Sequence, residues 1–179
     1  MAVSAPVRRM MVEEFLQMER PVGDFDYELH DGELVQVTRP NRMHVGMQAR
    51  LVRLLNSELD KQGFVSTEVP FRVSQGDLRV ADVAFVTWLR WEVPGSETLV
   101  GAPELVIEVL SPSNTAAEMY AREKLCLENG CLQFWTVDLM NQQFRVGSLN
   151  EAPRFYGRGE EIPLKAFGGS TLKLAAVFV

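Results

Sequence analysis

Two acidic residues interrupt segments whose neighbours are otherwise apolar. Asp82 lies in the run Val-Ala-Asp-Val-Ala-Phe-Val, and Glu108 lies in Leu-Val-Ile-Glu-Val-Leu. Both runs are typical of buried strands, where a lone carboxylate must be paired, protonated or bound to a cation. A hard divalent cation such as Mg²⁺ would offset the repulsion between two such carboxylates, because it prefers oxygen ligands. Pairing with an arginine, for instance Arg79 or Arg122, is the alternative, and these residues alone leave both interpretations open.

The segments around the two acids predict strands that alternate with helices. Asp31-Gly32 stands between two alternating runs and predicts a β-hairpin. In the segment 43–61, apolar side chains recur at the spacing of a helix. Thr115 and Glu118 form a capping-box pattern that begins another helix, which Gly130 would end. Further strands are predicted at 65–73, 78–86, 105–110, 132–137, 144–146 and 171–174.

A first short helix is expected over residues 11–19, with Phe15 and Leu16 pointing inward. The order of elements indicates a mixed central β-sheet flanked by helices, in one α/β (α+β) domain over residues 1–179. The length of 179 residues and the mass of 20.2 kDa are usual for one domain.

Composition excludes several classes of protein. Hydrophobic residues make up 46% and charged residues 23%, which is a globular balance and not that of a disordered chain. Two cysteines, Cys126 and Cys131, are too few for a disulfide framework or a zinc ligand set. No apolar run approaches the length of a membrane span, and no secretory segment follows Met1. We therefore expect a soluble cytoplasmic protein without a membrane partner.

The net charge of −6 argues against tight, nonspecific binding of nucleic acid. The segment 39–53 is an exception, because it carries four arginines and no acid. Three of them, Arg42, Arg50 and Arg53, cluster within a half-face of the predicted helix. They indicate either a phosphate-binding surface or an ordinary solvated face.

Several motifs resemble one known family. Residues 79–86 (Arg-Val-Ala-Asp-Val-Ala-Phe-Val) and 102–115 (Ala-Pro-Glu-Leu-Val-Ile-Glu-Val-Leu-Ser-Pro-Ser-Asn-Thr) are similar to segments of the Uma-type restriction endonuclease family, within the PD-(D/E)XK nuclease superfamily. Residues 27–34, 130–138 and 169–178 also resemble that family, in the same order. The resemblance implies a restriction-endonuclease-like core with an N-terminal hairpin extension.

The resemblance also implies a mechanism and a substrate. Asp82 and Glu108 correspond to the acids that hold Mg²⁺ or Mn²⁺ in the superfamily, and the carbonyl of Val109 would be the third oxygen ligand. Such a metal makes a bound water more acidic and neutralises the charge of a phosphate. The implied partner is nucleic acid, with DNA as the substrate of a metal-dependent endonuclease. A homodimer is also expected.

Two further residues match recurring positions of that family. Glu28 would complete the metal site or contact a water, although it is also suited to pair with an arginine. His44 would join the site, but a single histidine on an apolar helix face is also typical of a hydrogen-bonded core residue.

The catalytic lysine of the superfamily is missing from its common position, which is Leu110 in this chain. In the Uma-type family the lysine has moved to the next helix, where ungapped alignment places Arg122 rather than Lys124. Arginine can neutralise a phosphate but cannot act as a base. The other interpretation of Arg122 is an ordinary pair with Glu118 one helical turn away.

This departure leaves three functions open. The first is the endonuclease, with Arg122 neutralising the charge of the phosphate. The second is a catalytically inactive nuclease fold that serves as a nucleic-acid-binding or protein-interaction module. The third is a glycosidase that uses two carboxylates, which two isolated acids do not exclude.

Overall fold

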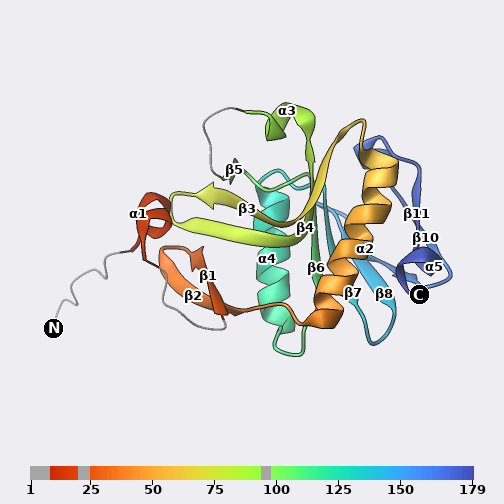
Figure 1. Ribbon diagram of the computed structural model, residues 1–179, viewed down its shortest axis with the longest axis horizontal. Coiled ribbons are helices and arrows are strands. Elements are labelled where there is room, and N and C mark those ends of the chain that lie inside the picture. Colours follow the sequence, from red (N-terminus) through yellow and green to blue (C-terminus); the bar gives the residue numbers. More distant parts are fainter. Residues whose placement is uncertain (1–8, 20–24, 94–97) are drawn as a thin grey trace.

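A mixed β-sheet with one long helix on each face is the framework of the structure (Figure 1). The computed structural model describes residues 9–19, 25–93 and 98–179. The α-helices are α1 (Val12–Gln17), α2 (Arg42–Leu59), α3 (Trp88–Trp91), α4 (Ala116–Glu128) and α5 (Leu174–Val177), and a 3₁₀ turn, η1, spans Lys165–Phe167. The strands are β1 (Phe25–His30), β2 (Glu33–Thr38), β3 (Gly63–Ser74), β4 (Asp77–Thr87), β5 (Leu99–Val100), β6 (Leu105–Val109), β7 (Gln133–Asp138), β8 (Gln143–Gly147), β9 (Arg154–Gly157), β10 (Glu161–Pro163) and β11 (Thr171–Lys173).

The main sheet has nine strands among the described residues. Seven follow the order β2-β1-β4-β6-β7-β8-β9, while β3 pairs with β4 and with the short β5. The β6–β7 and β3–β5 pairs are parallel, and the other pairs are antiparallel. Strands β10 and β11 form a separate hairpin. No helix in the described parts of the chain is both long and apolar enough to cross a membrane.

The sheet divides at β4. This strand pairs with β6 only over residues 83–85, and with β1 only at Leu78. Between those pairings, residues 79–82 have no partner strand on that side within the described structure. Asp82 therefore lies at the fork where β4 and β6 separate, and its side chain accepts a hydrogen bond from the backbone N–H of Val109 there.

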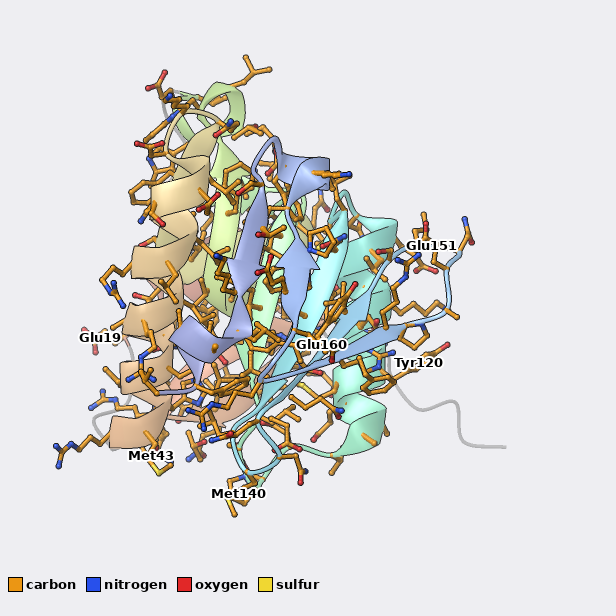
Figure 2. The ribbon with its side chains drawn as sticks, turned by 90° about the vertical axis from the view of Figure 1, so that its right-hand side faces the viewer. Glu19, Met43, Tyr120, Met140, Glu151 and Glu160 are labelled. Atoms are coloured by element: carbon orange, nitrogen blue, oxygen red, sulfur yellow. The ribbon has the colours of Figure 1, made fainter. Side chains whose placement is uncertain are left out.

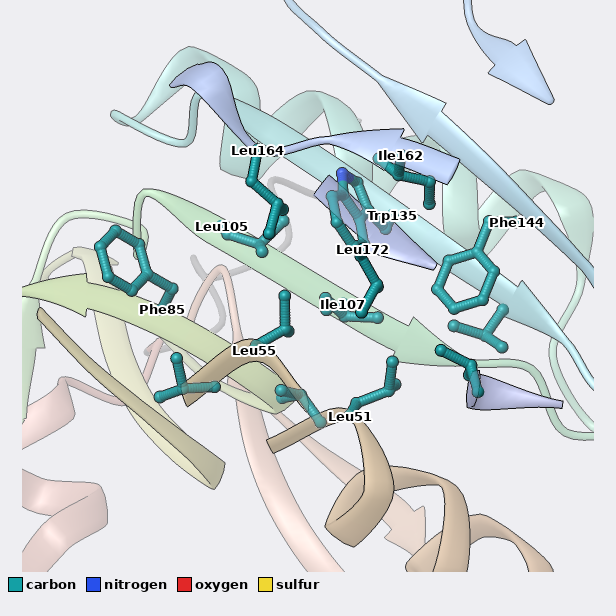
Figure 3. Packing of buried hydrophobic residues seen from close by; sticks show 14 of the residues in the cluster. Leu51, Leu55, Phe85, Leu105, Ile107, Trp135, Phe144, Ile162, Leu164 and Leu172 are labelled. Atoms are coloured by element: carbon teal, nitrogen blue, oxygen red, sulfur yellow. The ribbon is translucent and has the colours of Figure 1, made fainter. Parts of the chain in front are cut away.

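Large apolar side chains fill the space between α2 and the sheet. Leu51 and Leu55 of α2 are fully buried, together with Ile107 of β6 and Trp135 of β7 (Figure 3). The β10–β11 hairpin and α5 belong to the same cluster. Figure 2 shows α4 on the opposite side of the sheet from α2. The apolar cluster there is smaller and includes Cys126.

The main elements confirm the predictions from the sequence. Asp31 (φ 48°) and Gly32 (φ 78°) both adopt the left-handed conformation that the Asp-Gly hairpin turn requires. Thr115 and Glu118 form the expected capping box at the start of α4. The expectation that Leu16 points inward is wrong, because its side chain is exposed. Of this pair, only Phe15 faces the core. Adjacent residues of a helix differ by about 100° in direction, so a short helix on a surface buries only one of them.

The packing predicts a large difference between two leucines. Leu55→Ala should lower the free energy of unfolding by about 2–5 kcal/mol, because it leaves a cavity beneath α2. Leu89→Ala, at a position 87% exposed, should change it by less than about 0.5 kcal/mol. Urea denaturation of the two variants and the wild type measures both effects. Equal losses would contradict this assignment of the core.

Candidate active site

Arg122 of α4 holds together three strands at the fork of the sheet. Its Nε donates to Oε1 of Glu108 at 3.0 Å, and its Nη1 donates to Oε2 of Glu28 at 3.0 Å. Its Nη2 donates to Oε1 of Glu28 at 3.1 Å and to the carbonyl oxygen of Val80. The Arg122 side chain is only 11% exposed. A buried guanidinium is stable in this place because each of its three nitrogens has an acceptor.

Glu28 is the most strongly stabilised carboxylate of this cluster. Besides Arg122, it accepts a hydrogen bond from the backbone N–H of Val80 at 2.8 Å and lies 2.7 Å from Nε2 of His30. Burial disfavours its charged form, but Arg122, His30 and the Val80 N–H together outweigh burial and lower the pKa of Glu28 from 4.5 to about 2. Glu28 therefore stays ionised and fixes the guanidinium.

Asp82 lies beside the end of β6. The backbone N–H of Val109 donates to its Oδ2 at 2.7 Å, and Nε2 of His44 lies 2.9 Å from the same oxygen. His44 occupies the first turn of α2, where the side chain of Asn41 caps the helix by accepting from the N–H groups of Met43 and His44. Burial disfavours the charged imidazole, but the adjacent Asp82 carboxylate outweighs it and raises the pKa of His44.

Gln48 and Glu68 also belong to this cluster, and the sequence did not single them out. Nε2 of Gln48 donates to Oε1 of Glu68 at 2.6 Å and lies 3.4 Å from Oδ1 of Asp82. Glu68 and Asp82 lie between the paired positions Thr67–Val83 and Val69–Ala81 of β3 and β4. Glu68 adopts a left-handed backbone conformation (φ 52°), which is rare for this residue type. Such conformations are concentrated at functional sites. A polar residue in the apolar stripe of α2 was the available signal for Gln48.

Negative charge exceeds positive charge in this region. Burial, together with the charges of Asp82 and Glu28, raises the pKa of Glu108 well above its ordinary value, although Arg122 opposes this shift. Burial and the Asp82 charge likewise raise the pKa of Glu68. Four carboxylates thus share one arginine and two histidines. A bound cation would relieve this excess of negative charge.

The residues at the fork are suited to a magnesium ion that has few protein ligands and keeps most of its waters. No group of three or more His, Cys, Asp or Glu side chains in the described ranges is arranged to hold a metal. Mg²⁺ does not need such a group, because it commonly takes one or two carboxylates and keeps its waters. Glu108 Oε2 has no hydrogen-bond partner among the described residues and is available as such a ligand.

The structure decides between several pairings that the sequence left open. Glu108 pairs with Arg122, whereas Arg79 pairs with Asp77 at 2.8 Å and not with Asp82. The expected alternative of a Glu118–Arg122 pair is not what forms, because Glu118 caps α4 instead.

Lys124 pairs with Glu128 on the exposed side of α4 at 3.9 Å. Of the predicted site residues, Glu28, Glu108 and Arg122 form one hydrogen-bonded cluster, and Asp82 and His44 form the neighbouring one. Val109 links the two through its N–H, while a role for its carbonyl stays a prediction.

Comparisons with known proteins agree with this architecture. The Uma2 family, described as "Putative restriction endonuclease", matches residues 12–175. A solved structure from Anabaena variabilis ATCC 29413, described as "a putative nuclease belonging to DUF820", has a similar fold with a TM-score of 0.78. It is 21% identical, and the match covers 94% of this chain and 97% of that chain. No curated protein matches the chain.

The pKa of Glu28 predicts how its contribution to stability depends on pH. Because this pKa is lowered on folding from 4.5 to about 2, the ionised form stabilises the fold above pH 4.5, and this contribution is lost as the pH falls towards 2. Glu28→Gln should therefore cost about 3 kcal/mol at pH 7. The difference from the wild type should shrink between pH 4.5 and 2.

Urea denaturation of both proteins at several pH values measures this difference. Glu33→Gln, an exposed change in the neighbouring strand β2, is the matched control and should show little difference at any pH. A difference for Glu28→Gln that stays constant down to pH 2 would contradict the assigned role of its charge.

Proposed function

The chain belongs to the Uma2 family, and from this premise we propose that it is a metal-dependent nuclease that hydrolyses phosphodiester bonds of DNA. The observation that carries the proposal is the meeting of Asp82 with the end of β6. Oδ2 of Asp82 accepts from the N–H of Val109, the residue next to Glu108. Two carboxylates from separate strands are thereby brought to one fork of the sheet, in surroundings with too few positive charges.

The residues assigned to the metal are Asp82 and Glu108, with the carbonyl of Val109 as a third oxygen, and the ion is Mg²⁺ or Mn²⁺. Carboxylate and carbonyl oxygens are the ligands that both ions prefer. When bound, such an ion supplies an acidified water as nucleophile and neutralises charge on the phosphate. The buried, acidic character of the fork supports this assignment.

The other site residues would position and balance these ligands. His44 holds Asp82 from the first turn of α2, 2.9 Å from its Oδ2. Arg122 places Glu108 through its Nε, and Glu28 fixes the other end of the guanidinium. Because its nitrogens are bonded within the protein, Arg122 would act on the phosphate through its charge and not by direct hydrogen bonds. It has no proton to give or take near neutral pH.

A catalytically inactive nuclease fold, kept to bind nucleic acid or protein, is the second candidate. Two observations favour it. Lys124 points to the exposed side of α4 and pairs with Glu128, so it does not replace the missing lysine. Arg122 is committed to Glu28, Glu108 and the Val80 carbonyl. For the nuclease we propose that the partner is nucleic acid, with DNA as the substrate that the resemblance above implies, and that the chain forms a homodimer.

Cleavage by purified wild type, Glu108→Gln and Glu128→Gln would test the proposal. Plasmid, single-stranded DNA and RNA are each incubated with Mg²⁺, Mn²⁺ or EDTA. We expect the wild type to cut DNA only with metal. Glu108→Gln should lose about 100-fold or more in rate, because its carboxylate is a metal ligand. Glu128→Gln makes the same chemical change at an exposed position of α4 and should retain wild-type activity.

Two results would contradict the nuclease. Equal cutting by wild type and Glu108→Gln would show a contaminating or unrelated activity. No cutting by the wild type, with retained binding of DNA, would favour the inactive module, and Arg122→Lys then tests whether a lysine at this place restores activity.

A further inference from the structure

A cavity of about 440 Å³ lies beside the candidate active site, on the other flank of α4. It is open to solvent on one side and is lined by the first half of α4, by Leu110 just after β6, and by the strands β7 and β8. Figure 2 shows Tyr120 projecting from α4 at this place. Its lining includes Leu110, Met119, Tyr120, Glu123, Thr136 and Arg145.

The polar part of the cavity is an ion pair between a helix and a strand. Nη1 of Arg145, in β8, donates to both carboxylate oxygens of Glu123 at 2.9 Å. The Glu123 side chain is only 9% exposed. It fits because residue 147 is glycine, since a Cβ there would lie 1.7 Å from Oε1 of Glu123. The pair is thus built into the fold and is not a surface contact.

This pair leaves hydrogen-bonding groups free. Among the described residues, only Nη1 of Arg145 has a partner, so its Nε and Nη2 remain available. The hydroxyl of Thr136, on the buried face of β7, likewise has no partner in the described parts of the chain. A ligand would therefore find several donors and the edge of a carboxylate on one side of the cavity.

The remaining lining is mostly apolar, includes one aromatic ring, and also contains the polar residues Asn114 and Thr115. Tyr120 is 66% exposed, and Met119 and Leu110 lie beside it in the lining. A flat, aromatic ligand with polar edges matches such a site. Its face can stack on a tyrosine ring, while its edge bonds to arginine, glutamate and threonine side chains, as in known recognition of bases.

The position of the cavity relates it to the proposed chemistry. Leu110 follows Glu108 by two residues, and on α4 Met119 and Glu123 flank Arg122. A strand whose phosphate lies at the fork would carry its neighbouring bases past this cavity. In a duplex those bases are stacked and paired, and a base reaches such a cavity only when it is unpaired or turned out of the helix.

We propose that this cavity binds an unpaired nucleobase of the substrate strand, next to the phosphate that is cut. The inference rests on the proposed function and deepens it, because it makes single-stranded or locally opened nucleic acid the preferred substrate. Tyr120 supplies the stacking surface, and the Arg145–Glu123 pair supplies the polar edge.

Binding without metal tests this inference separately from cleavage. Fluorescence anisotropy in EDTA compares single-stranded DNA, single-stranded RNA and duplex DNA of one sequence, with 2-aminopurine at a central position. We expect tighter binding of a single strand than of the duplex, with quenching of 2-aminopurine by stacking. The tighter of the DNA and RNA single strands identifies the source of the base.

Tyr120→Ala should weaken single-strand binding about tenfold, and Tyr120→Phe should leave it within about twofold, because the phenyl ring still stacks. Tyr120 is exposed, so both variants should fold, and thermal melting verifies this. Arg145→Met should also weaken binding. Because it leaves the buried Glu123 without its ion-pair partner, this variant is a secondary test.

Equal affinity of Tyr120→Ala and wild type for the single strand would overturn the inference, and so would equal affinity for single strand and duplex. The plasmid assay with Mg²⁺ remains the test of the nuclease. Tyr120-dependent binding by a protein that does not cut would therefore refute the proposed hydrolysis while supporting the base-binding cavity.

Discussion

Arg122 joins helix α4 to three strands of the sheet, and the geometry of the fork depends on this one side chain. Its guanidinium bonds to Glu28 in β1, to the Val80 carbonyl in β4 and to Glu108 in β6. Removing one partner of a buried pair costs about 3–5 kcal/mol, because the other charge is left without compensation. Apolar side chains of the same total volume would stabilise the fold at least equally. A buried arginine with two glutamates is therefore better explained by the charge that it brings to the fork.

Helix α4 is positioned by charge on both of its flanks. Arg122 reaches towards β1, β4 and β6, while Glu123, the next residue, reaches Arg145 in β8. The apolar residues that α4 contributes to the cluster on this face are Cys126 and the partly buried Leu127. The helix on the other face, α2, is held instead by large apolar residues such as Leu51 and Leu55. The proposed active site and the proposed base-binding cavity thus share α4 as a common wall.

The sequence was sufficient to predict most of the fold and to single out the two acids at the fork, whose role as metal ligands stays a prediction. Asp82 and Glu108 could be found because each is an acid in an apolar run, and the Asp31-Gly32 turn and the Thr115 capping box are local signals. For Gln48 the only local signal was a polar residue in the apolar stripe of α2, and Glu68 had no comparable signal. Their meeting depends on the register of β3 against β4 and on the direction of α2 across the sheet.

The sequence left two partners open for Arg122. Its position on α4 allows a pair with Glu118 one helical turn away or a contact with the acids of the sheet. Strands of two to four residues, such as β5, β9 and β10, carry too few side chains to show a period. They form because neighbouring strands offer free backbone groups, which is a property of the assembled sheet. Features set by local sequence, such as turns and helix caps, were therefore predictable. Features set by long-range strand pairing were not.

If the fork between β4 and β6 holds a divalent cation, a crystal of the protein soaked with Mn²⁺ should reveal the ion there by its anomalous diffraction. We expect an anomalous peak within ligand distance, about 2.0–2.3 Å, of both the Asp82 and Glu108 carboxylates, with Arg122 still paired to Glu28. Mn²⁺ bound elsewhere, with the Asp82 and Glu108 contacts unchanged and no peak between them, would contradict it.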